Sequence, residues 1–229
     1  ALPTQYKNNK QDYLKLIEEE MLPKIAKEGL ADYIDVFCEK GYFSVEDMEC
    51  IVNSGKRYGL IPKVHVNQFN IIGGIPSAIK LGALSVDHLE VVNQEDIDAL
   101  KNSTTMPTLL PSCSFFLNIP YAPARKMMSE GLPVCLASDY NPGSTPSGNM
   151  NFVVSLACIQ MKMNPEEAIN AATINGAYAM GISKSEGSIA KGKKGNIFIT
   201  KQIPSYAFLP YNFGHNTIKK VFINGCEFK

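Results

Sequence analysis

The sequence has no excess of charge of either sign, because 22 lysines and arginines balance 22 aspartates and glutamates over its 229 residues. It also lacks any run of basic residues. Such runs, or a strongly positive net charge, are typical of proteins that bind nucleic acid or anionic membranes. The composition therefore predicts neither kind of partner and favours a small-molecule ligand.

Long apolar runs are missing as well. No run approaches the roughly 18 residues that cross a bilayer, and the first residues lack the charged and then apolar pattern of a signal peptide. We therefore expect a cytoplasmic protein. Since the chain does not begin with methionine, we also expect it to be a piece of a longer protein. The sequence leaves open whether that protein is a homo-oligomer.

The cysteines show no CxxC spacing, which argues against a zinc knuckle and against a disulfide framework. Most of them occur inside apolar segments, so we expect reduced thiols in the protein core. The six are Cys38, Cys50, Cys113, Cys135, Cys158 and Cys226.

Short apolar runs rich in β-branched residues alternate with stretches of helical periodicity. An amphipathic helix is predicted over residues 9–28. The predicted strands then cover residues 33–38, 61–65, 83–88, 106–110 and 132–139. Each is followed by a predicted helix. The first of these helices begins after Ser44, and the other four cover residues 75–81, 94–101, 123–130 and 151–161.

This alternation predicts an α/β protein whose parallel sheet is covered by helices, either a doubly wound sheet or a closed barrel. Five strand–helix units are too few for an eight-stranded barrel, so we expect a partial (β/α) barrel over residues 1–184. A helix capped by Asn164 should run to about residue 180. Residues 185–229 contain Gly-rich turns around two β runs and are predicted to form a small β domain.

Polar residues end three of the predicted strands: His65, His88 and Asp139. In a parallel barrel the carboxyl ends of the strands carry the chemistry, so these side chains can converge. Imidazole nitrogen and carboxylate oxygen suit zinc or iron. A single histidine beside an apolar run is more often a hydrogen-bonded structural residue, but three such strand ends together favour a metal site. His88 and Asp139 are then the candidates for proton transfer to and from a metal-activated water.

Two further segments could contact a substrate. Gln68 follows His65 by three residues, where its amide could bond a carbonyl or ring nitrogen, although an exposed loop amide is the simpler interpretation. The turn after Asp139 offers Asn141, Gly143 and Ser144, whose amides and side chains could hold a carboxylate. His215 lies outside this pattern, and we expect it to be structural.

Seven segments spread along the chain form a recognisable set: ADYIDVFCE (31–39), KVHVNQ (63–68), GALSVDHL (82–89), YAPARKM (121–127), ASDYNPGS (137–144), PEEAINAATIN (165–175) and GSIAKGK (187–193). These segments resemble the imidazolonepropionase family, metal-dependent amidohydrolases of histidine degradation. The resemblance covers essentially the whole chain and is specific when the segments are taken together.

The resemblance implies a TIM-barrel amidohydrolase, with a β-sandwich built from both chain ends, that binds one zinc or iron ion. Its reaction would be hydrolysis of 4-imidazolone-5-propanoate to N-formimidoyl-L-glutamate. By resemblance, His65 and Asp139 match metal ligands and His88 matches a catalytic histidine. The positions that match substrate contacts are Gln68, Asn141, Gly143 and Ser144.

The chain departs from the family pattern in two respects. The family's His-x-His metal pair and further substrate contacts belong to an N-terminal half that this sequence does not contain, and Gly195-Asn196 replaces the usual Ala-Asp. We expect the latter change to affect only the sandwich. Two alternatives therefore stay open: a non-catalytic fragment or binding module, and another amidohydrolase such as a ring deaminase.

Overall fold

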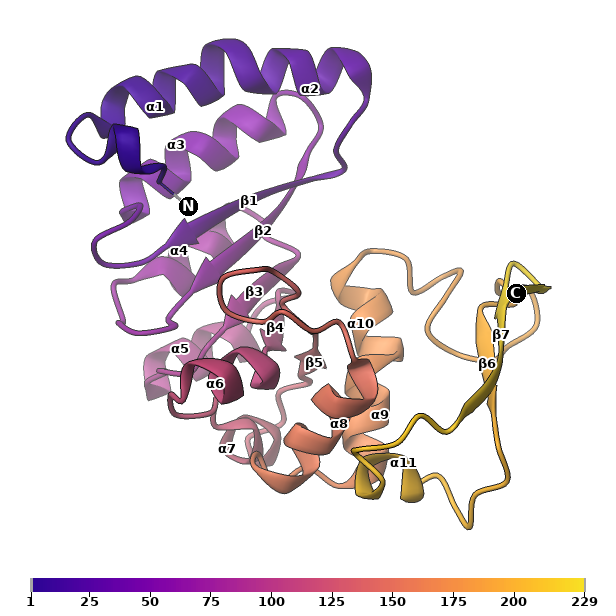
Figure 1. Cartoon of the computed structure of the whole chain (residues 1–229). Helices are drawn as coiled ribbons and strands as arrows, with labels where there is room; N and C mark the ends of the chain where they lie inside the picture. The colour runs from indigo at the N-terminus through magenta and orange to yellow at the C-terminus, as the bar shows by residue number, and fades with distance from the viewer. Residues whose placement is uncertain (1, 229) are drawn as a thin grey trace. The chain divides into compact units, whose positions relative to one another are not determined.

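The computed structural model describes residues 2–228. It separates into two compact units, the first ending at Pro107 and the second beginning at Thr108. Figure 1 shows the helices and strands in chain order. This division separates the two most compact parts of the chain and does not test the domain boundary expected between residues 184 and 185, which stays a prediction.

Three parallel strands form the centre of the first unit, with β1 beside β2 and β2 beside β3. Val36 and Cys38 on β1, like Val64 and Val66 on β2, are buried toward the helices, as alternate residues of a strand should be. The strands are β1 (Tyr33–Cys38), β2 (Ile61–Val66) and β3 (Ser85–His88), and the helices after them are α3 (Val45–Lys56), α4 (Gly74–Lys80) and α5 (Gln94–Lys101).

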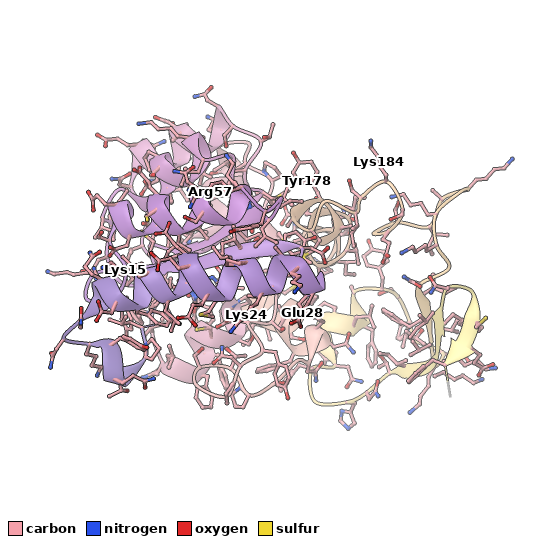
Figure 2. All side chains as sticks on the ribbon, turned by 90° about the horizontal axis from the view of Figure 1, so that it is seen from above. Lys15, Lys24, Glu28, Arg57, Tyr178 and Lys184 are labelled. Carbon is pink, nitrogen blue, oxygen red and sulfur yellow. The ribbon has the colours of Figure 1, made fainter. Side chains whose placement is uncertain are left out.

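The helix predicted over residues 9–28 is present, but its middle turn has π geometry. It consists of α1 (Lys10–Leu16), η2 (Ile17–Met21) and α2 (Leu22–Glu28), after a short helix η1 (Thr4–Tyr6). Pro23 explains the wider turn, since its nitrogen has no hydrogen to donate to the preceding turn. Figure 2 shows this helix from above, with Lys15, Lys24 and Glu28 along it and Arg57 directly after the neighbouring α3.

The five parallel strands follow the order β1-β2-β3-β4-β5. Strand β4 (Met106–Leu109) straddles the division, and β5 (Cys135–Leu136) pairs with it in parallel. The strand predicted over residues 132–139 is thus much shorter in the structure. Pro133 has no amide hydrogen for the ladder, and Asp139 adopts a left-handed backbone with φ of 53°.

The helices of the second unit differ from the prediction in two places. Helix α6 was not predicted, and the helix expected over residues 164–180 is divided at Thr173, whose hydroxyl bonds the Ile169 carbonyl at 2.7 Å. The helices are α6 (Pro111–Leu117), α7 (Ala124–Ser129), α8 (Met150–Ile159), α9 (Pro165–Ala172) and α10 (Ile174–Ala179).

A small antiparallel sheet forms near the end of the chain, as expected. Its strands are β6 (Ile197–Thr200), β7 (Ile218–Ile223) and β8 (Cys226–Phe228), and the unpredicted helix α11 (Phe208–Tyr211) lies between β6 and β7 in the chain. Gly195 approaches the Gly225 backbone so closely that a Cβ atom would lie 2.9 Å from its nitrogen. Asn196 bonds Glu186 and the Asn224 amide, so these contacts of the unusual Gly-Asn pair stay within the tail.

All six cysteines are free thiols, as predicted, but they do not all belong to the core. Cys38, Cys113 and Cys135 are buried, whereas Cys50 and Cys226 are exposed and Cys158 is half-buried. The apolar surroundings of Cys50 and Cys226 in the sequence were misleading, because these residues lie on the outer faces of α3 and β8.

Burial raises the pKa of the Cys38 thiol to about 12, so the thiol stays protonated at neutral pH. Its side chain is also fully buried, which keeps reagents away from the sulfur. We expect a thiol-specific alkylating reagent to modify Cys226 first in the native protein and Cys38 only after unfolding. Peptide mass spectrometry over a time course checks this order. Early labelling of Cys38 would contradict the described packing of β1.

Among residues 2–228, no helix combines the length and apolar character needed to cross a membrane.

Candidate functional site

Two of the three predicted strand-end residues lie together in the first unit. One ring nitrogen of His65, on β2, and one of His88, on β3, lie within 4.8 Å of each other. Their ring centroids are 5.2 Å apart. Two imidazoles at this separation can both reach a single metal ion, so the structure brings His65 and His88 into one site.

The backbone at the end of β3 explains how His88 reaches His65. The parallel register aligns His65 with Asp87 and Val66 with His88, so regular alternation would place His88 on the buried face with Val66. His88 instead has φ of 90° and Leu89 has φ of 62°. Non-glycine residues in this region are uncommon and tend to occur at functional sites. This reversal of the backbone turns the His88 ring toward His65.

A carboxylate on the neighbouring strand holds the His65 ring. Asp35 Oδ1, on β1, lies 2.8 Å from His65 Nδ1. Because an ionised carboxylate only accepts, Nδ1 carries the hydrogen, and in the neutral ring Nε2 has the lone pair. This arrangement, in which a carboxylate fixes the tautomer and orientation of a ligand histidine, is common in metal sites. Asp35 was not predicted from the sequence, although a single aspartate within an apolar strand was a usable signal.

His88 has a carboxylate neighbour of its own. Its Nδ1 lies 3.4 Å from the Glu90 carboxylate, and both side chains are almost fully buried. A buried imidazole next to a carboxylate can accept and return a proton with less reorganisation than one in water. Glu90 was also missed, because its distance from His88 depends on the reversed backbone between them.

Gln68 is buried in the loop that follows β2, with only 6% of its surface exposed. The preceding residue, Asn67, has a left-handed backbone with φ of 55° and donates from its side chain to Asp96 Oδ2 at 3.0 Å. Burial raises the pKa of the Asp96 carboxyl, while hydrogen bonds from Asn93 and Asn67 oppose that shift. The interpretation of Gln68 as an exposed loop amide is therefore wrong.

In the second unit, Asp139 opens a compact turn that contains the other predicted contacts. Asn141 Oδ1 accepts hydrogen bonds from the amides of Gly143 and Ser144, each at 2.8 Å. Ser144 Oγ donates to Asp139 Oδ2 at 3.2 Å, and Asn141 Nδ2 donates to the Asp139 carbonyl at 2.7 Å. The structure thus gathers Asp139, Asn141, Gly143 and Ser144 into one hydrogen-bonded unit. His215 is exposed in a loop that precedes β7.

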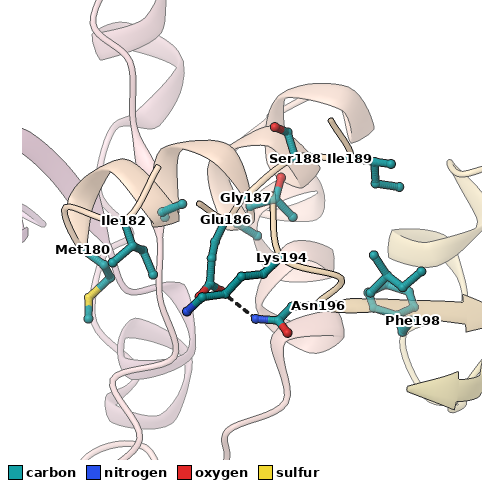
Figure 3. Close-up of a pocket in the computed structure, with 14 residues that line it drawn as sticks. Met180, Ile182, Glu186, Gly187, Ser188, Ile189, Lys194, Asn196 and Phe198 are labelled. Carbon is teal, nitrogen blue, oxygen red and sulfur yellow. Dashed lines mark hydrogen bonds and ion pairs between the residues drawn. The ribbon is translucent and has the colours of Figure 1, made fainter. Parts of the chain in front are cut away.

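The second unit also contains a cavity of about 440 Å³ between α10 and the segment that leads to β6. Figure 3 shows Met180, Ile182 and Phe198 around it and the hydrogen bond between Glu186 and Asn196 at 3.0 Å. None of the predicted site residues lines this cavity. Its titratable lining residues, Glu186 and Lys194, pair with each other at 3.0 Å, and no histidine lines it.

Curated relatives of known name match almost the whole chain. It is 66% identical over 225 residues to an imidazolonepropionase from Flavobacterium psychrophilum and 44% identical over 225 residues to one from Clostridium tetani. These alignments cover 98% of this chain but only 55% and 54% of the relatives. The chain therefore spans about half the length of the curated relatives it matches, and the predicted resemblance is confirmed over that part.

Solved structures agree on the fold. An adenosine deaminase from Xanthomonas campestris with bound zinc superposes with a TM-score of 0.74 at 14% identity, covering 91% of this chain and 55% of that one. The ochratoxinase of A. niger gives a TM-score of 0.70 at 21% identity, covering 93% and 55%. At these identities the likeness concerns the fold alone. The amidohydrolase family model itself matches residues 8–227, and the chain belongs to that family.

Proposed function

We propose that this chain belongs to a metal-dependent imidazolonepropionase, which hydrolyses 4-imidazolone-5-propanoate to N-formimidoyl-L-glutamate. The observation that carries the proposal is the 66% identity to a relative of that name, over a region that includes every predicted site residue. The paired imidazoles of His65 and His88 support it, because hydrolysis of a cyclic amide by this family's chemistry needs a metal site.

The donor set fits a zinc or iron ion. Imidazole nitrogen and carboxylate oxygen are ligands for both metals, and the bond that His65 Nδ1 donates to Asp35 leaves Nε2 of the neutral ring as the nitrogen available to a metal. We propose His65 and Asp139 as ligands. When bound, such an ion would polarise the ring carbonyl and lower the pKa of a bound water to about 7.

The roles of the other predicted site residues follow from the chemistry of their side chains. His88, with Glu90 beside its Nδ1, would accept and return the proton of the attacking water, and Asp139 would share that task. Gln68 would hydrogen-bond the ring of the substrate through its amide. The amides and side chains of the turn from Asn141 to Ser144 would bind the propanoate carboxylate, which would replace Asn141 Oδ1 as the acceptor for Gly143 and Ser144.

The reaction is tested by identifying its product. The intact protein is incubated with 4-imidazolone-5-propanoate and, in a parallel reaction, with adenosine, and the products are analysed by mass spectrometry. We expect N-formimidoyl-L-glutamate from the first and no ammonia from the second. Ammonia release from adenosine with the imidazolone unchanged would support a ring deaminase, and no product from either would support a non-catalytic binding module.

The hydrogen bond from His65 to Asp35 gives a separate prediction. We expect Asp35→Ala to weaken zinc binding about 10- to 100-fold, because the His65 ring loses the carboxylate that fixes its tautomer and orientation. Competition with a chromophoric chelator measures the affinity. Asp32→Ala is the matched control, since this exposed aspartate lies just before the same strand. Equal affinities for the two variants would show that Asp35 does not orient a metal ligand.

A further inference from the structure

The loop of residues 67–70, here called the Gln68 loop, makes side-chain hydrogen bonds on both sides of Gln68. Gln68 is buried, as is Asn67 before it, which is 1% exposed, whereas Phe69 after it is about half exposed. The loop begins directly after the carboxyl end of β2 at Val66. Its conformation therefore decides where the Gln68 amide lies.

One anchor of the loop is a buried carboxylate. Glu39 follows β1 directly and is 1% exposed. Its Oε2 accepts hydrogen bonds from the amides of Phe69 at 2.9 Å and Asn70 at 3.3 Å. Its Oε1 accepts from Asn70 Nδ2 at 3.0 Å and from the Lys40 amide at 2.9 Å. Three of these four donors belong to the Gln68 loop.

The second anchor lies on the other side of Gln68. Asn67 Nδ2 donates to Asp96, whose other bonds complete the capping box of α5. The Asn67 carbonyl accepts from the Val91 amide at 3.0 Å. Gln68 is consequently clamped between a bond to α5 on its amino side and the Glu39 carboxylate on its carboxyl side.

Burial of a carboxylate is unfavourable unless hydrogen bonds compensate for its lost hydration. Such bonds to an ionised acceptor are short and roughly twice as strong as neutral ones. Glu39 accepts three of its four hydrogen bonds from the Gln68 loop, so its effect is to immobilise that loop. A group that binds substrate gains most from this kind of preorganisation, because a displacement of about 1 Å can reduce the rate about 100-fold.

We infer that Glu39 is a positioning residue, which fixes the Gln68 loop and thereby holds the Gln68 amide against the ring of the substrate. This inference deepens the proposed function and rests on it. Glu39 itself touches no reacting atom and acts through Gln68 alone.

The test is a double-mutant cycle in the intact protein. Glu39→Gln preserves the size of the side chain but places an NH₂ group against donors that need an acceptor. We expect kcat/KM for 4-imidazolone-5-propanoate to decrease about 10- to 100-fold in Glu39→Gln and in Gln68→Ala. In the Gln68→Ala background, Glu39→Gln should cause no further decrease. Asp47→Asn is the control, because Asp47 is another buried carboxylate that accepts backbone and side-chain bonds, at the cap of α3.

Hydrogen–deuterium exchange supplies a readout that does not depend on activity. The amides of Phe69 and Asn70 should exchange faster in Glu39→Gln, with β2 amides unchanged, and Asp47→Asn should leave both groups as they are. Additive losses of kcat/KM, or unchanged exchange at Phe69 and Asn70, would overturn the positioning role while leaving the proposed function intact. Absence of hydrolysis by the unsubstituted protein would instead overturn the proposed function and the role of Gln68 with it, even if Glu39 proved to anchor the loop.

Discussion

Replacing His65 with alanine is expected to leave the purified protein almost free of zinc and iron, whereas the unsubstituted protein retains one of them. The substitution removes Nε2, the lone-pair donor that the bond between Nδ1 and Asp35 makes available. It also leaves the Asp35 carboxylate without its imidazole partner. Elemental mass spectrometry of the purified protein measures the metal content directly.

The matched control is His215→Ala, because His215 is exposed in a loop of the second unit and has no predicted role in the site. Its metal content should equal that of the unsubstituted protein. Retention of metal by His65→Ala would contradict the assignment of His65 as a ligand, and loss of metal from His215→Ala would place the ion elsewhere.

Replacing His88 should have a different effect, namely a loss of turnover with the metal retained. We expect kcat to fall by a factor of about 10² to 10⁴, the usual contribution of a positioned acid–base group. Two substitutions separate chemistry from backbone strain. Asn tolerates the left-handed conformation that His88 adopts at φ of 90°, whereas Ala does so poorly.

If His88 acts in proton transfer, His88→Asn and His88→Ala lose kcat to a similar extent, and only His88→Ala loses stability in a thermal melt. Unchanged kcat in His88→Asn would show that the imidazole is not the proton carrier. Loss of metal from both variants would mean that His88 is a ligand, alongside His65.

The positions of the parallel strands followed from the sequence because each is a short apolar run between turn residues. Strand β1 covers the predicted residues, and β7 and β8 form a hairpin around Asn224 and Gly225, which both have positive φ as such a turn requires. Backbone details were harder to predict. The π turn at Pro23, the division at Thr173 and the shortening of β5 each depend on one residue that opposes the surrounding pattern. Helix α6 was not predicted, although Pro111 at its first position is a helix-start signal.

The site shows the same contrast. Residue type and strand-end position were enough to predict that His65 and His88 lie together. The partners of the two rings were not predictable in the same way, because Asp35 reaches His65 through the register of β1 against β2, and Glu90 reaches His88 through a backbone reversal. Glu39 was missed because its hydrogen bonds go to a loop about 30 residues further along the chain.

The most direct test of a metal-dependent imidazolonepropionase is the metal dependence of product formation. The intact protein is stripped with a chelator, assayed with 4-imidazolone-5-propanoate, and assayed again after addition of zinc or iron. Our account predicts that N-formimidoyl-L-glutamate disappears on stripping and returns with at least one of the two metals. Equal product formation by the stripped protein, or no product in any state, would contradict it.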